Sequence, residues 1–68
     1  MASHVRLDIY DVAGRRVRTL LDGQRTATRH TVVWDGRNDA GDGMPPGVYF
    51  VRLEAPSLIE TREVVLLK

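Results

Sequence analysis

Apolar and polar residues alternate along several short segments of the chain, and a period of two is typical of β-strands. The plainest case is residues 48–54, in which Tyr49, Val51 and Leu53 share one face. Two prolines and Gly47 come directly before this segment. Because proline cannot donate to a sheet ladder, it fits the beginning of a strand and not its middle. We therefore predict that residues 48–54 form the central strand.

Comparable patterns elsewhere predict a small set of strands separated by turns. The expected strands are residues 4–10, 15–21, 30–35, 48–54 and 59–67. Residues 11–14 and 55–58 have the composition of tight turns, and residues 36–44 are dense in glycine, aspartate and asparagine. Residues 22–29 are polar and predict a loop. Short strands at this spacing indicate an all-β antiparallel sandwich of about five strands.

The segment 15–21 permits more than one arrangement. As a strand it would place Val17, Thr19 and Leu21 on one side, or Val17 and Leu20 if it contains a bulge. As a helix it would gather the valine and both leucines on one face. Seven residues between turn signals are short for a helix, so a strand is the preferred interpretation.

A few residues are expected to carry the structure. A lone tryptophan in a small sandwich is usually its core anchor, and glycines serve the turns and the approach to a strand. An Asp-Gly pair would turn the chain after the third strand. The predicted structural residues are Gly14, Trp34, Asp35, Gly36, Gly47, Tyr49, Val51 and Leu53.

Length and composition exclude several classes of protein. With 68 residues the chain is one small domain, and without cysteine it has neither disulfides nor a thiolate metal site. A net charge of +1 gives no argument for binding nucleic acid or acidic lipid. No apolar run approaches the ~20 residues of a membrane span. Residues 1–3 are interpreted as a cloning remnant or a disordered start, and residues 4–68 as the domain.

Four oxygen-bearing side chains crowd one loop and raise the question of calcium. They are Asp35, Asn38, Asp39 and Asp42. The EF-hand spacing fails, because the twelfth position counted from the first aspartate is Pro46 instead of glutamate. Turn capping by the aspartates and the asparagine is the preferred interpretation, with calcium binding left as the alternative.

Residues 15–29 form a basic strip, since this segment contains several arginines and a single acidic residue. Such a strip could follow a phosphate backbone. No aromatic residue interleaves with these arginines, as a stacking platform requires, so a solvated strand face is preferred.

The residue types of common active sites are poorly represented. His4 and His30 share no metal-binding spacing, and the serines have no nucleophile-elbow context. The sequence therefore predicts no catalytic residue, no cofactor and no metal. Tyr10 and Phe50 are candidate surface aromatics, which leaves stacking on sugar rings as an alternative function.

Several short motifs occur in a recognisable order. They are residues 9–11 (IYD) with 14–15 (GR), 34–36 (WDG), 47–50 (GVYF) and 61–66 (TREVVL). Together they resemble the Ig-like domain of the flagellar hook-capping protein and the related type IX secretion sorting domains, over residues 4–68.

The resemblance implies an Ig-like β-sandwich without catalytic activity, placed at the C-terminus of a bacterial exported or surface protein. Such a module would aid secretion, anchoring or assembly through contacts with secretion or surface proteins or with neighbouring domains of its parent, outside the cell. Nucleic acid is not an expected partner. The alternatives are a flagellar hook-cap assembly domain and a carbohydrate-binding accessory domain.

The chain departs from the family at its beginning. Members of the family usually carry another strand before the segment that corresponds to residues 4–10. Either the chain is a fragment or a sheet edge is left unpaired, and an unpaired edge is a template for another strand. We therefore predict self-association through an open sheet edge.

Overall fold

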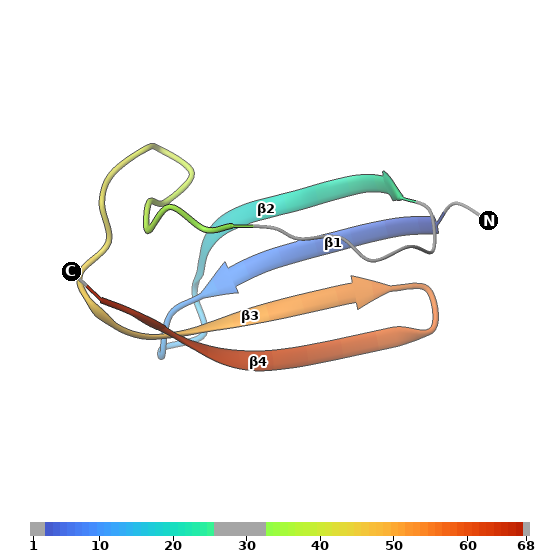
Figure 1. Ribbon diagram of the computed structural model, residues 1–68. Coiled ribbons are helices and arrows are strands. Elements are labelled where there is room, and N and C mark those ends of the chain that lie inside the picture. The colour runs from blue at the N-terminus through green and yellow to red at the C-terminus, as the bar shows by residue number, and fades with distance from the viewer. Residues whose placement is uncertain (1–2, 26–32, 68) are drawn as a thin grey trace.

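A computed structural model of the chain describes residues 3–25 and 33–67, whose strands form one antiparallel sheet (Figure 1). The strands are β1 (Ser3–Tyr10), β2 (Arg16–Arg25), β3 (Gly47–Ala55) and β4 (Leu58–Leu66). Their order is β2-β1-β3-β4, so β1 and β3 are inner strands and β2 and β4 are the edges. The described ranges contain strands and no helix, which confirms the all-β antiparallel class. None of these segments forms a helix that is long and apolar enough to cross a membrane.

Three of the predicted strands are found close to their expected bounds. Residues 4–10, 48–54 and 59–67 correspond to β1, β3 and β4. β3 pairs with β1 on one side and with β4 on the other, as a central strand should. Ala55 and Leu58 face each other across a two-residue turn, which confirms the second hairpin.

The expected strand 30–35 is not observed where the structure can test it. Residues 33–35 have irregular backbone, and residues 30–32 lie outside the described residues. Asp35 and Asn38 bond to backbone N–H groups within their own loop. Short polar side chains that do this offer the backbone an alternative to a sheet ladder. Here that alternative prevails over the alternating pattern.

β2 confirms the strand interpretation of residues 15–21 and corrects the predicted loop at 22–29. The strand continues to Arg25, which pairs with Ser3, and residues 26–29 lie outside the described residues. Pairing with β1 decides the conformation here. An edge strand is partly solvated, so polar residues do not prevent its formation.

The register between β1 and β2 shifts twice and identifies the bulged arrangement. Leu7 is opposite Leu21 but Asp8 is opposite Thr19, which leaves Leu20 as an additional residue. A second shift, between Ile9 and Tyr10 of β1, leaves Val17 unopposed in the same way. Val17 is buried in the core and Leu20 packs against it, so the alternative with Val17 and Leu20 inside is the correct one.

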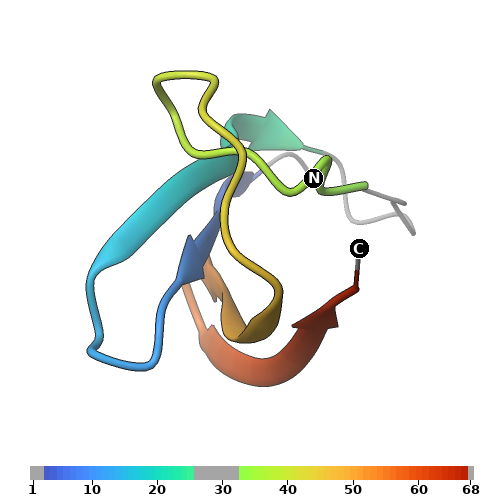
Figure 2. The same ribbon diagram turned by 90° about the vertical axis from the view of Figure 1, so that its left-hand side faces the viewer.

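The sheet curves strongly, and residues 33–46 run along its inner side (Figure 2). We call this segment the covering loop. Ile9, Val17 and Tyr49 form the buried core cluster. The partly buried residues packed on this cluster come from both the sheet and the loop, and they are Leu20, Trp34, Met44, Val51, Val64 and Leu66. In the described part of the chain, the layer that faces the sheet is therefore this loop.

Candidate functional site

The covering loop is fastened to the sheet by an aromatic pair. The rings of Trp34 and Tyr49 meet edge to face, with centroids 5.0 Å apart and planes at 69°. Trp34 Nε1 donates to the carbonyl of Arg37 at 2.9 Å, and the Tyr49 hydroxyl donates to the carbonyl of Pro45 at 2.6 Å. Both polar ends of the pair are thus satisfied by loop backbone. Such an aromatic contact contributes about 0.5–1.5 kcal/mol beyond the buried area.

Asp35 and Gly36 form a tight turn directly after the tryptophan. Asp35 Oδ1 accepts hydrogen bonds from the backbone N–H of Arg37 and from Arg18 Nη1, both at 3.0 Å. Gly36 has a φ of +78°, and a Cβ added there would lie 3.1 Å from Leu66 Cδ1. The position requires glycine because both the left-handed backbone and the close approach of β4 disfavour a side chain.

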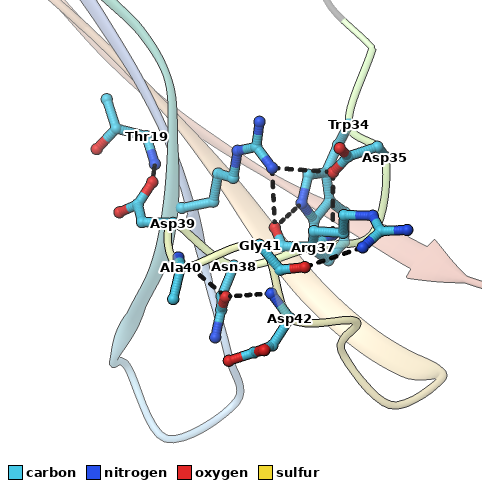
Figure 3. A network of polar contacts seen from close by, with 10 residues as sticks. Thr19, Trp34, Asp35, Arg37, Asn38, Asp39, Ala40, Gly41 and Asp42 are labelled. Atoms are coloured by element: carbon cyan, nitrogen blue, oxygen red, sulfur yellow. Dashed lines mark hydrogen bonds and ion pairs between the residues drawn. The ribbon is translucent and has the colours of Figure 1, made fainter.

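The same loop reaches the outer edge of β2, where Asp39 lies beside Thr19 (Figure 3). The backbone N–H of Asp39 donates to the carbonyl of Val17 at 3.2 Å, and Asp39 Oδ1 accepts from the backbone N–H of Thr19 at 3.1 Å. One donor and one acceptor of the edge strand are therefore occupied by a single loop residue, as a neighbouring strand would occupy them.

Other polar groups of the loop are used within it. Asn38 Oδ1 accepts from the backbone N–H groups of Ala40 and Asp42 at 3.0 and 2.9 Å, and Arg37 Nη1 donates to the carbonyl of Gly41 at 2.9 Å. This is the turn capping expected from the sequence. Among the residues that the structure describes, no group of three or more His, Cys, Asp or Glu side chains could hold a metal ion.

The remaining predicted structural residues lie in the sheet and its first turn. Gly14 closes the β1–β2 turn with a φ of +82°, and Gly47 begins β3 with a φ of +148°. Tyr49 is 5% exposed, Val51 packs against the core cluster, and Leu53 is half-buried on the same strand.

The β1–β2 turn is held by Asp11. Its Oδ1 accepts from the backbone N–H groups of Ala13 and Arg15 at 3.0 and 2.9 Å, and its Oδ2 accepts from Arg15 Nε at 3.1 Å. The hydrogen bond from the Arg15 backbone, assisted by the Arg15 charge, lowers the pKa of Asp11 below its ordinary value.

The outer face of the sheet carries a buried carboxylate that the sequence analysis missed. Asp8 is 3% exposed, and it accepts from Arg6 Nε at 2.8 Å and from the Thr19 hydroxyl at 2.7 Å. The hydrogen bond to Asp8 and the charge of this aspartate raise the pKa of Arg6. The available signal was an aspartate on the polar side of a strand, two residues after an arginine.

Two aromatic residues considered for sugar binding meet on this outer face. Tyr10 and Phe50 are opposite each other in the β1–β3 register, and both are half-buried. They border a shallow hollow of about 330 Å³ together with Arg52, whose Nε is buried and lacks a hydrogen-bond partner in the described structure.

In the described residues, one histidine and two arginines of the basic strip form ion pairs at the surface. His4 Nε2 lies 2.7 Å from Asp22 Oδ1 on the surface, and His30 is outside the described residues. Arg15 and Arg18 are paired with Asp11 and Asp35, as described above.

The edge of β4 is the surface best suited to contact another protein, because Asp39 occupies backbone groups at the edge of β2. β4 has no strand on its outer side in the described ranges, and several of its apolar side chains are exposed, among them Ile59 at 59% and Val65 at 58%. An antiparallel sheet with one face covered by its own loop and, in the described ranges, one edge without a neighbouring strand is a small all-β module, consistent with an Ig-like domain. Comparison with known sequences makes the assignment specific.

The chain belongs to the FlgD Ig-like domain family, which it matches over residues 1–57. It is 41% identical over 54 residues to the basal-body rod modification protein FlgD of Salmonella typhimurium and, with the same values, to that of Salmonella typhi. The match covers 79% of this chain and 23% of each relative, so the chain corresponds to less than a quarter of their length. No solved structure matches significantly. These matches support the hook-capping part of the predicted resemblance and do not support the sorting-domain part.

Proposed function

We propose that this chain is an assembly module of a flagellar hook-capping protein, outside the cell, and that it acts by binding other proteins without catalysis. The observation that carries the proposal is the family match together with the 41% identity to basal-body rod modification proteins. This replaces the broader expectation of a secretion or anchoring module. Its partners are neighbouring domains of the parent protein and other subunits of the cap.

The geometry suits such a role because the module offers fixed surfaces. The covering loop is held over the core by the aromatic pair and by the Asp39 contacts with β2. A strand of a partner can add to an exposed sheet edge through backbone hydrogen bonds, with side chains setting the specificity. In the described residues the outer edge of β4 has no neighbouring strand, which suits this mode of binding.

A domain exchange tests the proposal. In the FlgD of Salmonella typhimurium, the segment that corresponds to this chain is replaced by the whole chain, residues 1–68, so that β4 is included, and hook formation and swimming are scored in a strain lacking its own FlgD. We expect hooks to form. The control carries Trp34→Ala in the exchanged segment and should form far fewer. A chimera that is exported and folded but forms no hooks would contradict the proposal.

Binding of a polysaccharide is a second candidate, favoured by the shared hollow of Tyr10 and Phe50. Aromatic faces can stack on sugar rings, and Arg52 lies beside them. Retention of the chain on insoluble polysaccharide, lost in Tyr10→Ala and Phe50→Ala but kept in Val33→Ala, which is exposed and lies outside the hollow, would support it. Retention no greater than in a control without polysaccharide would rule out polysaccharide binding.

A further inference from the structure

In the described part of the chain the outer edge of β4 has no neighbouring strand, and the sequence of β4 is self-complementary. In Figure 1 β4 forms the lower border of the sheet, and its hydrogen-bonded neighbour in the described residues is β3 alone. On its inner face the strand carries one acidic residue, Glu60, followed by one basic residue, Arg62. Their side chains already form an ion pair of 3.0 Å between Arg62 Nη2 and Glu60 Oε1, and both are accessible to solvent.

The register with β3 determines which backbone groups of β4 point outward. Alternate residues of an antiparallel strand direct both N–H and C=O to the same neighbour. Ala55 and Leu58 close a two-residue turn, and the ladder has no shift from there to Leu66. The even-numbered residues of β4 therefore bond to β3. The odd-numbered residues, Ile59, Thr61, Glu63 and Val65, present their N–H and C=O groups to the open side.

We propose that two copies of this chain pair antiparallel through β4, with Thr61 of each copy opposite Thr61 of the other. In this register Thr61 and its counterpart exchange two hydrogen bonds, and Ile59 does the same with Glu63 of the second copy. The two sheets then join into one continuous sheet about a two-fold axis, which is the usual symmetry of a homodimer.

Charge selects this register over its neighbours. With Thr61 at the centre, Glu60 of each copy lies opposite Arg62 of the other, and Leu58 lies opposite Val64. The smallest shift that keeps inner-face side chains opposite inner-face side chains is two residues. In one direction this shift places Arg62 opposite Arg62, and in the other it places Glu60 opposite Glu60. Like charges directly opposite destabilise a strand pair, whereas opposite charges stabilise it.

The second copy is the occupant that these residues favour over an unrelated strand. The complementarity lies within β4 itself, so a strand of the same sequence satisfies both charged positions at once. The contact is small compared with the standard interface of about 1,600 Å², so we expect a reversible dimer that forms at high protein concentration.

Charge reversal and its rescue test the proposal on the full chain. Sedimentation equilibrium from about 10 µM to about 1 mM should show a concentration-dependent dimer. Glu60→Arg alone should weaken association at least about tenfold, because arginines then face each other. Adding Arg62→Glu restores the opposite charges and should return the affinity to within about threefold of the parent. Association unaffected by the single change, or not restored by the double change, overturns the proposal.

A backbone test separates this edge from other contacts. Thr61→Pro removes an outward N–H that β3 does not use, so the domain should keep its fold, verified by circular dichroism, and lose dimerisation. Thr61→Ala keeps the N–H and should dimerise. A parent chain that stays monomeric at every concentration, or a folded Thr61→Pro that still dimerises, overturns the proposal.

This inference rests on the proposed assembly role for its use in the cell, but the two can fail separately. Dimerisation is measured on the isolated chain, and the assembly role is measured by hooks in the exchanged FlgD. A dimer without hook formation contradicts the role alone, and hooks formed by a chain that never dimerises contradict the pairing alone.

Discussion

The two edges of the sheet differ in what lies beside them. β2 is met by the covering loop, where Asp39 donates to Val17 and accepts from Thr19. β4 has no such neighbour in the described ranges. Both edges are built from ordinary strand residues, so strand sequence alone does not decide which is free. Asp39, a loop residue 20 positions from Thr19, covers the edge of β2, and no segment of the described ranges does the same for β4.

The largest loss of unfolding free energy is expected from removing the anchor that holds the covering loop on the sheet. Trp34→Ala deletes the ring packed on Tyr49 and the hydrogen bond to Arg37, and should cost about 3 kcal/mol. That is a large part of the stability of so small a domain. Urea unfolding should show it, with Val33→Ala as control because Val33 is 81% exposed. Equal midpoints for the two variants would mean that Trp34 is not the anchor.

A somewhat smaller effect is expected at the turn that follows the tryptophan. Gly36→Ala places a Cβ at a left-handed residue and 3.1 Å from Leu66, and should cost about 2 kcal/mol. Gly14→Ala has a similar φ but no atom within 4 Å, and should cost about 1 kcal/mol. The difference between their unfolding free energies measures the close approach of β4. If the Gly14 variant were as destabilised as the Gly36 variant, the close approach of β4 would not contribute to the cost at Gly36.

Removing the contact that covers β2 should have a modest effect with a local signature. Asp39→Ala leaves the Thr19 N–H without its acceptor, and should cost about 1 kcal/mol. Hydrogen exchange at Thr19 should accelerate, so that this edge comes to resemble that of β4. Asp42→Ala is the matched control, because its backbone alone takes part in the hydrogen bonds of the turn. Unchanged exchange at Thr19 would show that Asp39 does not cover the edge.

The smallest effect is expected from pH at the turn that joins β1 to β2. The pKa of Asp11 is lowered in the folded chain from its ordinary value of 3.8. A lowered pKa stabilises the fold above the unfolded value, and this contribution is lost as the pH falls through the folded pKa. The unfolding free energy should therefore decline below about pH 4, and less steeply in Asp11→Asn. Identical pH profiles of the parent chain and the Asp11→Asn variant would show that Asp11 does not cause this pH dependence.

Much of the site could be found from the sequence because its signals are local. The Asp35-Gly36 turn, the capping by Asn38 and the approach of Gly47 to β3 each depend on neighbours within a few residues. The docking of Asp39 on β2 had no such signal. Asp35 and Asn38 cap the loop as predicted, but nothing nearby distinguishes Asp39, whose side chain bonds to a strand. The burial of Asp8 was missed for a similar reason, since its partner Thr19 lies on another strand.

The sequence by itself determined that the chain is all-β and where β1, β3 and β4 run, because a period of two and the adjoining turn residues act over short distances. Only the tertiary structure decided that Val17 and Leu20 point inward, that residues 33–35 leave the strand pattern, and that within the described residues a loop covers the edge of β2 but not that of β4. These outcomes depend on register shifts and hydrogen bonds between segments far apart along the chain. The free energy of such contacts is set by the fold as a whole and is not visible in any local pattern.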